Sequence, residues 1–193
     1  MSANGEGLGR VLTVALGLCL VCSVVVSTAA VVLKPAQEAN KTRDLKRNIL
    51  LAAGLLDSSL SVEEQFEQVE TRVVDLDAGE FVDEIDPAAF DQREAAKDPQ
   101  LSRAIPGEDD PAKLVRREHQ ALVYLVRGEA GDLDKIILPI RGYGLWSTLY
   151  GFMALQADGN TIAGLGFYEH GETPGLGGEV DNPKWKAIWS GKQ

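Results

Sequence analysis

The hydropathy pattern divides the chain into an apolar stretch near the N-terminus and a long mixed region after it. Residues Val11 to Leu33 carry no charge and consist mainly of Val, Leu and Ala. Twenty-three residues in an α-helix span roughly 35 Å, which exceeds the bilayer core of about 30 Å. The pattern therefore predicts a transmembrane anchor over 11–33, preceded by an N-terminal tail over 1–10.

A cleaved signal peptide is the alternative interpretation of this stretch. Ser27-Thr28-Ala29 offers small residues at the spacing that a signal peptidase requires. The apolar run continues beyond that point, however, and Arg10 alone precedes it, so an uncleaved anchor is favoured. A lipoprotein signal is excluded because Leu18 and Val21, and not small residues, precede the two cysteines.

Helical periodicity governs the next part of the chain. The spacing predicts a helix over 36–56, with its apolar stripe at Leu45, Ile49, Ala52, Ala53 and Leu56. A second helix is expected from Ser61, because Glu64 three residues later completes a capping box. Its apolar stripe is Val62, Phe66, Val69 and Val73. A short strand over 73–76, a turn over 77–80 and a return strand over 81–85 follow.

From Gln120 the pattern changes to strands. Segments rich in β-formers cover 122–127, 135–140, 149–157 and 161–168. Asp158-Gly159-Asn160 between the last two is a hairpin signal, and Asn182-Pro183 predicts the start of a short helix. The pattern indicates an α+β fold with a mainly antiparallel sheet, divided into a helical, acidic, membrane-proximal region over 34–119 and a domain over 120–193.

Charge is distributed unevenly along the chain. The net charge is −10, but the residues through Arg47 carry a net charge of +3 and the remainder −13. An acidic body argues against nucleic acid as a partner, because phosphate binding requires a basic face. Fourteen acidic residues in 57–98 are interpreted as a solvated face, and 98–111 as a solvated loop. By the positive-inside rule, the basic residues after the anchor favour a cytoplasmic body.

Few residues suit metal or nucleophilic chemistry. Cys19 and Cys22 both lie in the apolar run and are interpreted as small apolar residues. His119 and His170 are the two histidines of the chain, and neither forms a ligand cluster in the sequence. Phosphate-binding glycine motifs are also missing from the sequence. We therefore predict no catalytic side chain and no metal site.

Two glycine-rich segments remain, over 141–146 and 170–178. Trp146 and Leu176 suit the face or edge of a planar ring, while Glu172 and the hydroxyl of Thr173 suit hydrogen bonds to its heteroatoms. Glycine lets the backbone approach a ligand closely, and it also permits tight turns. The residues alone leave both interpretations open: connecting turns or the wall of a ligand site.

The motifs Gly142-Tyr143-Gly144-Leu145-Trp146 and Glu169-His170-Gly171-Glu172-Thr173-Pro174-Gly175-Leu176-Gly177 carry a resemblance. With the single anchor, they resemble the FMN-binding domain of respiratory membrane flavoproteins over essentially the whole chain. Within this group the sequence is most similar to the family of C subunits of the Na⁺-translocating NADH:quinone oxidoreductase. The resemblance implies an electron-carrying component of a bacterial inner-membrane complex that couples electron transfer to Na⁺ export.

The resemblance also implies a cofactor site and sister subunits as partners. By position, Trp146, Glu172, Thr173 and Leu176 would border the isoalloxazine of FMN, and Pro174 and Gly175 would shape the turn. The family places its flavin domain in the periplasm, against the charge count, and we follow the family. It attaches FMN through a threonine in a Ser-Gly-Ala-Thr motif further along, which the final four residues 190–193 do not match. We therefore expect a fragment whose FMN-binding domain is incomplete at its C-terminus.

Two alternatives are kept. One is the related G subunit of the Rnf electron-transport complex, which has the same cofactor and a variant of the Glu-Thr-Pro-Gly-Leu-Gly core. The other is a membrane-anchored interaction module without a cofactor, which would fit the acidic face and the missing attachment motif.

Overall fold

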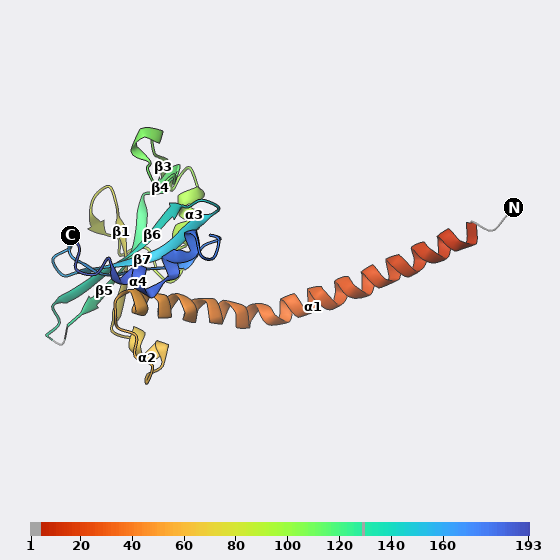
Figure 1. Ribbon diagram of the computed structural model, residues 1–193, viewed down its shortest axis with the longest axis horizontal. Coiled ribbons are helices and arrows are strands. Elements are labelled where there is room, and N and C mark those ends of the chain that lie inside the picture. Colours follow the sequence, from red (N-terminus) through yellow and green to blue (C-terminus); the bar gives the residue numbers. More distant parts are fainter. Residues whose placement is uncertain (1–4, 129) are drawn as a thin grey trace. The chain divides into compact units, whose positions relative to one another are not determined.

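Six antiparallel strands form the main sheet in this computed structural model, which describes residues 5–128 and 130–193. Their order is β2-β1-β5-β6-β7-β8, and Figure 1 shows several of them side by side. The strands are β1 (Val69–Asp75), β2 (Glu80–Phe81), β5 (Gln120–Arg127), β6 (Leu133–Tyr143), β7 (Thr148–Gln156) and β8 (Ile162–Glu169). The predicted α+β class with a mainly antiparallel sheet is confirmed.

Shorter elements complete the fold. A second, two-stranded sheet consists of β3 (Ser102–Ala104) and β4 (Arg116–Glu118). The helices are α1 (Gly5–Ala52), α2 (Val62–Phe66), α3 (Gln92–Lys97) and α4 (Pro183–Ala187), with the 3₁₀ turns η1 (Gly107–Asp109) and η2 (Gly177–Asp181).

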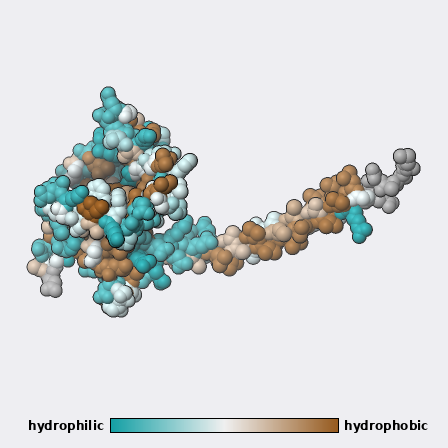
Figure 2. Space-filling model, viewed as in Figure 1, coloured by the Kyte–Doolittle hydropathy of each residue, from teal (hydrophilic) through white to brown (hydrophobic). Residues whose placement is uncertain are grey.

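The chain divides into one unit that ends at Arg43 and another over Asp44–Gln193. The first unit is part of α1, which is long and apolar enough to cross a membrane. Its side chains over 11–33 are exposed, and Figure 2 shows that part of the helix as largely apolar. The domain boundaries given above stay predictions, although β1 and β5 pair within one sheet.

The last turns of α1 belong to the core of the second unit. Ile49 and Leu50 are fully buried and share a cluster with Phe152 and Ile137 of the sheet. Tyr124 belongs to the same cluster and contacts Phe152 edge to face at 5.8 Å between ring centroids. The core therefore lies between the end of α1 and one face of the sheet.

Helix α1 ends at Ala52, earlier than the predicted Leu56. Gly54 has φ +68, and its N–H donates to the carbonyl of Leu51 at 3.1 Å. The N–H of Leu55 reaches back to the carbonyl of Leu50 at 2.9 Å. These two bonds form a Schellman motif, which satisfies the last carbonyls of the helix and stops it.

The prediction of the second helix is correct at the start of the helix and wrong at its end. Ser61 caps α2, and its reciprocal bonds with Glu64 confirm the capping box. The helix stops at Phe66, and Val69 begins strand β1, so the stripe that was expected to continue to Val73 belongs to two elements. Residues four apart share one face of a strand as well as one face of a helix, which made the pattern ambiguous.

The segment expected to be a loop over 98–111 is partly structured, because it contains β3 and η1. The expected return strand over 81–85 is limited to Glu80–Phe81. The four later strands, the turn at Asp158-Gly159-Asn160 and the helix that Asn182 caps are confirmed, with ends shifted by a few residues.

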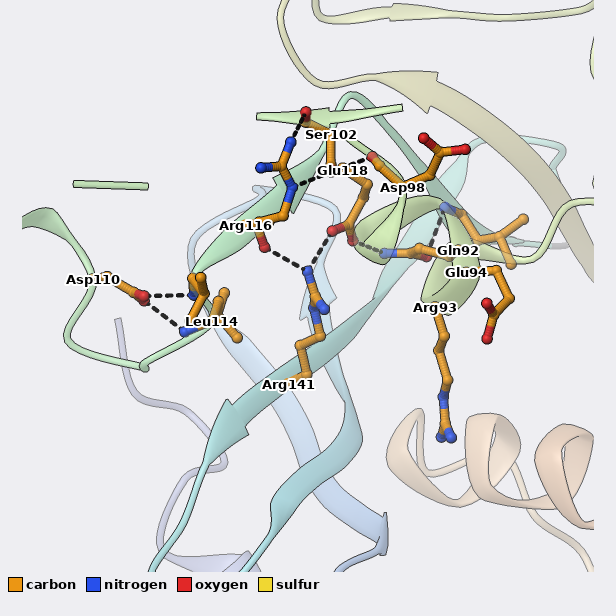
Figure 3. Close-up of polar contacts among 12 residues, drawn as sticks. Gln92, Arg93, Glu94, Asp98, Ser102, Asp110, Leu114, Arg116, Glu118 and Arg141 are labelled. Carbon is orange, nitrogen blue, oxygen red and sulfur yellow. Dashed lines mark hydrogen bonds and ion pairs between the residues drawn. The ribbon is translucent and has the colours of Figure 1, made fainter. Parts of the chain in front are cut away.

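A buried polar network joins the lobe of α3, β3 and β4 to the main sheet (Figure 3). The side chain of Gln92 donates to one oxygen of Glu118 at 2.6 Å, and Arg141 donates to the other at 2.6 Å. Arg141 also donates to the carbonyl of Arg116 at 3.0 Å. Through Arg141, the network ties β6, just before its C-terminal end, to the lobe.

Candidate functional site

Two loops at one end of the sheet carry the residues that the sequence singled out. The first connects β6 to β7 over residues 144–147, and the second follows β8 over residues 170–176 and continues into η2. Strands β6 and β7 pair up to Tyr143 and Thr148, and β7 and β8 pair up to Tyr150 and Glu169. The sheet therefore places both loops side by side.

The first loop is a tight reversal. The N–H of Gly144 donates to the carbonyl of Ser147 at 2.8 Å, which closes the turn between the paired strands. Leu145 and Trp146 at its tip cannot enter the core and remain 73% and 66% exposed. The loop thus presents two large apolar side chains to the outside.

The second loop is built mainly from backbone interactions. The carbonyl of Thr173 accepts hydrogen bonds from Leu176 N at 3.1 Å and from Gly178 N at 3.0 Å. Gly175 has φ +77, a left-handed conformation that favours glycine. Leu176 after this turn is 71% exposed, and Thr173 and Pro174 are exposed as well. The second loop therefore adds a third apolar side chain and an exposed hydroxyl-bearing residue.

Direct bonds hold the two loops together. The hydroxyl of Ser147 accepts the N–H of Gly171 at 2.6 Å. A carboxylate oxygen of Glu172 accepts the N–H of Trp146 at 3.0 Å and that of Ser147 at 3.3 Å. Glu172 is only 8% exposed, so it lies between the loops and does not point into solvent.

His170 fixes the beginning of the second loop. Its Nδ1 accepts the N–H of Glu172 at 3.2 Å, so the ring proton lies on Nε2, which donates to Asp181 at 2.8 Å. This histidine therefore holds η2 against the loop. Among residues 5–128 and 130–193, no three His, Cys, Asp or Glu side chains gather in a way that could hold a metal ion.

The guanidinium of Arg93 lies at the end of β8 from which the second loop starts. Arg93 of α3 donates to Tyr168 Oη and to Glu169 Oε2, both at 2.9 Å, and its guanidinium lies 3.6 Å from the ring centroid of Tyr150. Burial lowers the pKa of this guanidinium, but the bonds to Glu169 and Tyr168 outweigh burial and raise it. Arg93 is therefore always charged and fixes Glu169 just before the second loop.

The structure brings Trp146, Glu172, Thr173 and Leu176 into one pair of contacting loops, with Pro174 and Gly175 in the turn of the second loop. Their assignment as FMN contacts stays a prediction. Ser147, which bonds both loops, was not singled out from the sequence, because a serine after a tryptophan carries no distinctive signal.

These loops suit a flat amphipathic ring such as the isoalloxazine of FMN. The side chains of Leu145, Trp146 and Leu176 offer apolar contact, because residues 5–128 and 130–193 leave them largely exposed. The adjacent backbone is held rigid by Glu172 and Ser147, which is what a preformed ligand site requires.

Comparison with known proteins identifies the family of the chain. Residues 144–193 match the model of the FMN-binding domain, and this segment contains both loops. The chain is 56% identical over 194 residues to the C subunit of the Na⁺-translocating NADH-quinone reductase of Pseudomonas aeruginosa, covering 98% of this chain and 74% of that protein. The chain belongs to the family of C subunits of this reductase. The corresponding protein of Yersinia pestis is 47% identical, with 98% and 73% covered.

Solved structures from the same family show the same fold. NqrC of Shewanella oneidensis matches with a TM-score of 0.74 and 38% identity, covering 80% of this chain and 71% of that one. The C subunit of Parabacteroides distasonis matches with a TM-score of 0.63 and 30% identity, covering 82% and 69%. The predicted family and the predicted cofactor, FMN, are thereby confirmed, and an N-terminal membrane anchor is consistent with the apolar helix.

Proposed function

We propose that this chain is an electron-carrying subunit of a Na⁺-translocating NADH-quinone reductase and holds FMN at the loops 144–147 and 170–178. The observation that carries the proposal is the joining of these two loops by Glu172 inside the segment that matches the FMN-binding domain. When bound, FMN supplies the redox chemistry by taking up and releasing electrons. The protein supplies binding, orientation and the electrostatic setting.

The proposed roles follow from exposure and contacts. Trp146 and Leu176 would cover the ring with apolar surface, which removes water from it. The Thr173 hydroxyl and the backbone of the Pro174–Gly175 turn would orient its polar edge. Glu172 acts on the site through the loops, because one of its carboxylate oxygens already accepts two backbone N–H groups.

An FMN titration of the purified full chain in detergent tests the site. We expect protein-dependent quenching of flavin fluorescence, and binding weakened at least about tenfold in Trp146→Ala and in Leu176→Ala, because burying a side chain of this size contributes about 1.5–3 kcal/mol. Leu60→Ala is the matched control, because Leu60 is also exposed but lies before α2. Unquenched flavin with the unsubstituted chain would favour a module without a cofactor.

The place of the chain in its complex has its own test. In a strain that lacks this component, we expect the full-length gene to restore Na⁺ uptake driven by NADH in inverted membrane vesicles. Restored electron transfer between NADH and ferredoxin, without reduction of quinone, would instead favour the Rnf-type alternative.

We also propose that α1 crosses the bacterial inner membrane once over 11–33 and that the second unit lies in the periplasm. The length and hydropathy of this helix support the crossing. Periplasmic placement follows the family and runs against the basic residues after the anchor. Alkaline phosphatase fused after Gln193 should be active, whereas a cytoplasmic fluorescent reporter at the same position should be dark; the opposite result would reverse the orientation.

A further inference from the structure

Glu172 is a buried charged group in a chain segment that is otherwise exposed. Its neighbours Thr173, Pro174 and Gly175 are all exposed, whereas Glu172 is 8% exposed. A buried carboxylate is costly unless its oxygens are bonded. The N–H groups of Trp146 and Ser147 both donate to Oε1, so the first loop compensates in part for the burial of a residue in the second.

The surrounding backbone is shaped to admit this carboxylate. A Cβ at Gly144 would overlap Glu172 Oε1, and a Cβ at Gly177 would lie 2.6 Å from Oε2. Neither glycine has the positive φ that would explain it by backbone conformation. Glu172 therefore occupies the space of a side chain at Gly177, and it does so together with Leu149 Cδ1 at Gly144.

The backbone of Glu172 is fixed as well. Its N–H donates to Nδ1 of His170, and the N–H of Gly171 donates to the hydroxyl of Ser147. With its main chain and its side chain both bonded, Glu172 has one fixed position. The separation of Trp146 from the second loop depends on that position.

We propose that Glu172 is a positioning residue for the flavin, and that its charge lowers the midpoint potential of the bound cofactor. The proposal rests on the proposed FMN site and deepens it. The carboxylate joins the loop that bears Trp146 to the loop that bears Leu176, so it sets the geometry of both apolar contacts. The Glu172 side chain is buried, and a fixed negative charge that water screens poorly opposes the addition of electrons to a neighbouring group.

Two substitutions separate geometry from charge. Glu172→Gln keeps the acceptor oxygen and the volume and removes the charge, whereas Glu172→Ala removes all three. Glu179→Gln and Glu179→Ala are the matched controls, because Glu179 is an exposed carboxylate in η2 that bonds Asn182.

Hydrogen exchange in the full chain without added flavin tests the geometry. We expect exchange of the amides of Trp146 and Ser147 to be at least tenfold faster in Glu172→Ala, and close to the unsubstituted rate in Glu172→Gln and in both Glu179 variants. Unchanged exchange in Glu172→Ala would overturn the positioning role. If Glu172→Ala loses its secondary structure, judged by circular dichroism, Glu172→Asp undergoes the same test, because it retracts the carboxylate by one methylene.

A redox titration of the FMN-loaded chain tests the charge. We expect a more positive midpoint potential in Glu172→Gln, by up to the 59 mV that correspond to a tenfold change in a one-electron equilibrium, and no change in Glu179→Gln. An unshifted potential in Glu172→Gln would overturn the electrostatic part. If the unsubstituted chain does not bind FMN, the proposed function fails, while the exchange measurement still decides whether Glu172 holds the loops.

Discussion

Arg141 Nη2 lies 2.6 Å from Oε2 of Glu118, in an ion pair whose carboxylate side chain is 6% exposed. Gln92 occupies the other carboxylate oxygen, so the charge of Glu118 has two partners from two different elements. Arg141 lies near the C-terminal end of β6, three residues before the Gly144–Ser147 loop begins. The pair therefore braces the strand that leads into the proposed flavin site.

Removing one partner of this pair should be more harmful than removing both. Glu118→Ala leaves the Arg141 guanidinium largely buried without its counter-charge, and we expect a loss of about 3 kcal/mol in the free energy of unfolding. The double variant Glu118→Met/Arg141→Met should lose less. Urea unfolding followed by tryptophan fluorescence measures both, with Asp109→Ala at an exposed position as the control. A larger loss in the double variant would contradict this account.

Alkaline unfolding should depend on Tyr124. Burial raises the pKa of its phenol well above the ordinary value of about 10. Above pH 10 the unfolded chain releases this proton and the folded chain keeps it, so stability falls as pH rises, by up to about 1.4 kcal/mol per pH unit. Tyr124→Phe should lose stability less steeply between about pH 10 and 11.5. Parallel curves for the two proteins would show that the phenol does not contribute.

Gly164 should tolerate no side chain. A Cβ there would overlap the carbonyl oxygen of Ala52, where the last turn of α1 packs on β8. We expect Gly164→Ala to lower the thermal unfolding midpoint clearly, because the helix end must move and the core around Ile49 opens. Gly166→Ala on the same strand is the control, since its Cβ would meet only the Lys186 ammonium at 3.9 Å. Equal midpoints for the two variants would refute the close approach.

The capping box of α2 should contribute measurably to stability. Ser61→Ala removes the acceptor for Glu64 N, which is 3.2 Å from the hydroxyl oxygen, and we expect a loss of about 1 kcal/mol. The effect reaches the core because Phe66 of this helix contacts the Tyr124 ring. Ser58→Ala, at an exposed position, should leave the unfolding free energy unchanged in the same urea titration.

The sequence predicted correctly those turns and helix starts that are held by hydrogen bonds between neighbouring residues. Asp158 bonds the N–H groups of Asn160 and Thr161, and Gly159 adopts φ +66, so the hairpin needs nothing beyond its own residues. The same holds for the capping box at Ser61. The start of β1 was missed because Val69 and Val73, four apart and both buried, fit a helix and a strand equally well. Pairing with β5 decided between them.

The hydropathy pattern did not predict the lobe of α3, β3 and β4. Its strands are three residues long and mostly polar, so they show no alternation of apolar and polar residues. They pair with each other, and the network around Glu118 joins them to α3 and the main sheet through Gln92 and Arg141, which are 26 and 23 residues away from Glu118. At the site, the sequence identified both loops but not the way Glu172 joins them, because that contact depends on the pairing of β6, β7 and β8.

Because α1 runs from the anchor into the core, only part of this helix can change in length. Within the described part of the chain, residues before Asp44 make no part of the core, so we expect insertions or deletions there to leave the folding of the second unit intact. From Asp44 on, the helix contributes to the core, because Ile49 and Leu50 are fully buried there. A soluble version of this protein must therefore begin no later than Asp44, since cutting at the end of the helix would remove part of the interior together with the anchor.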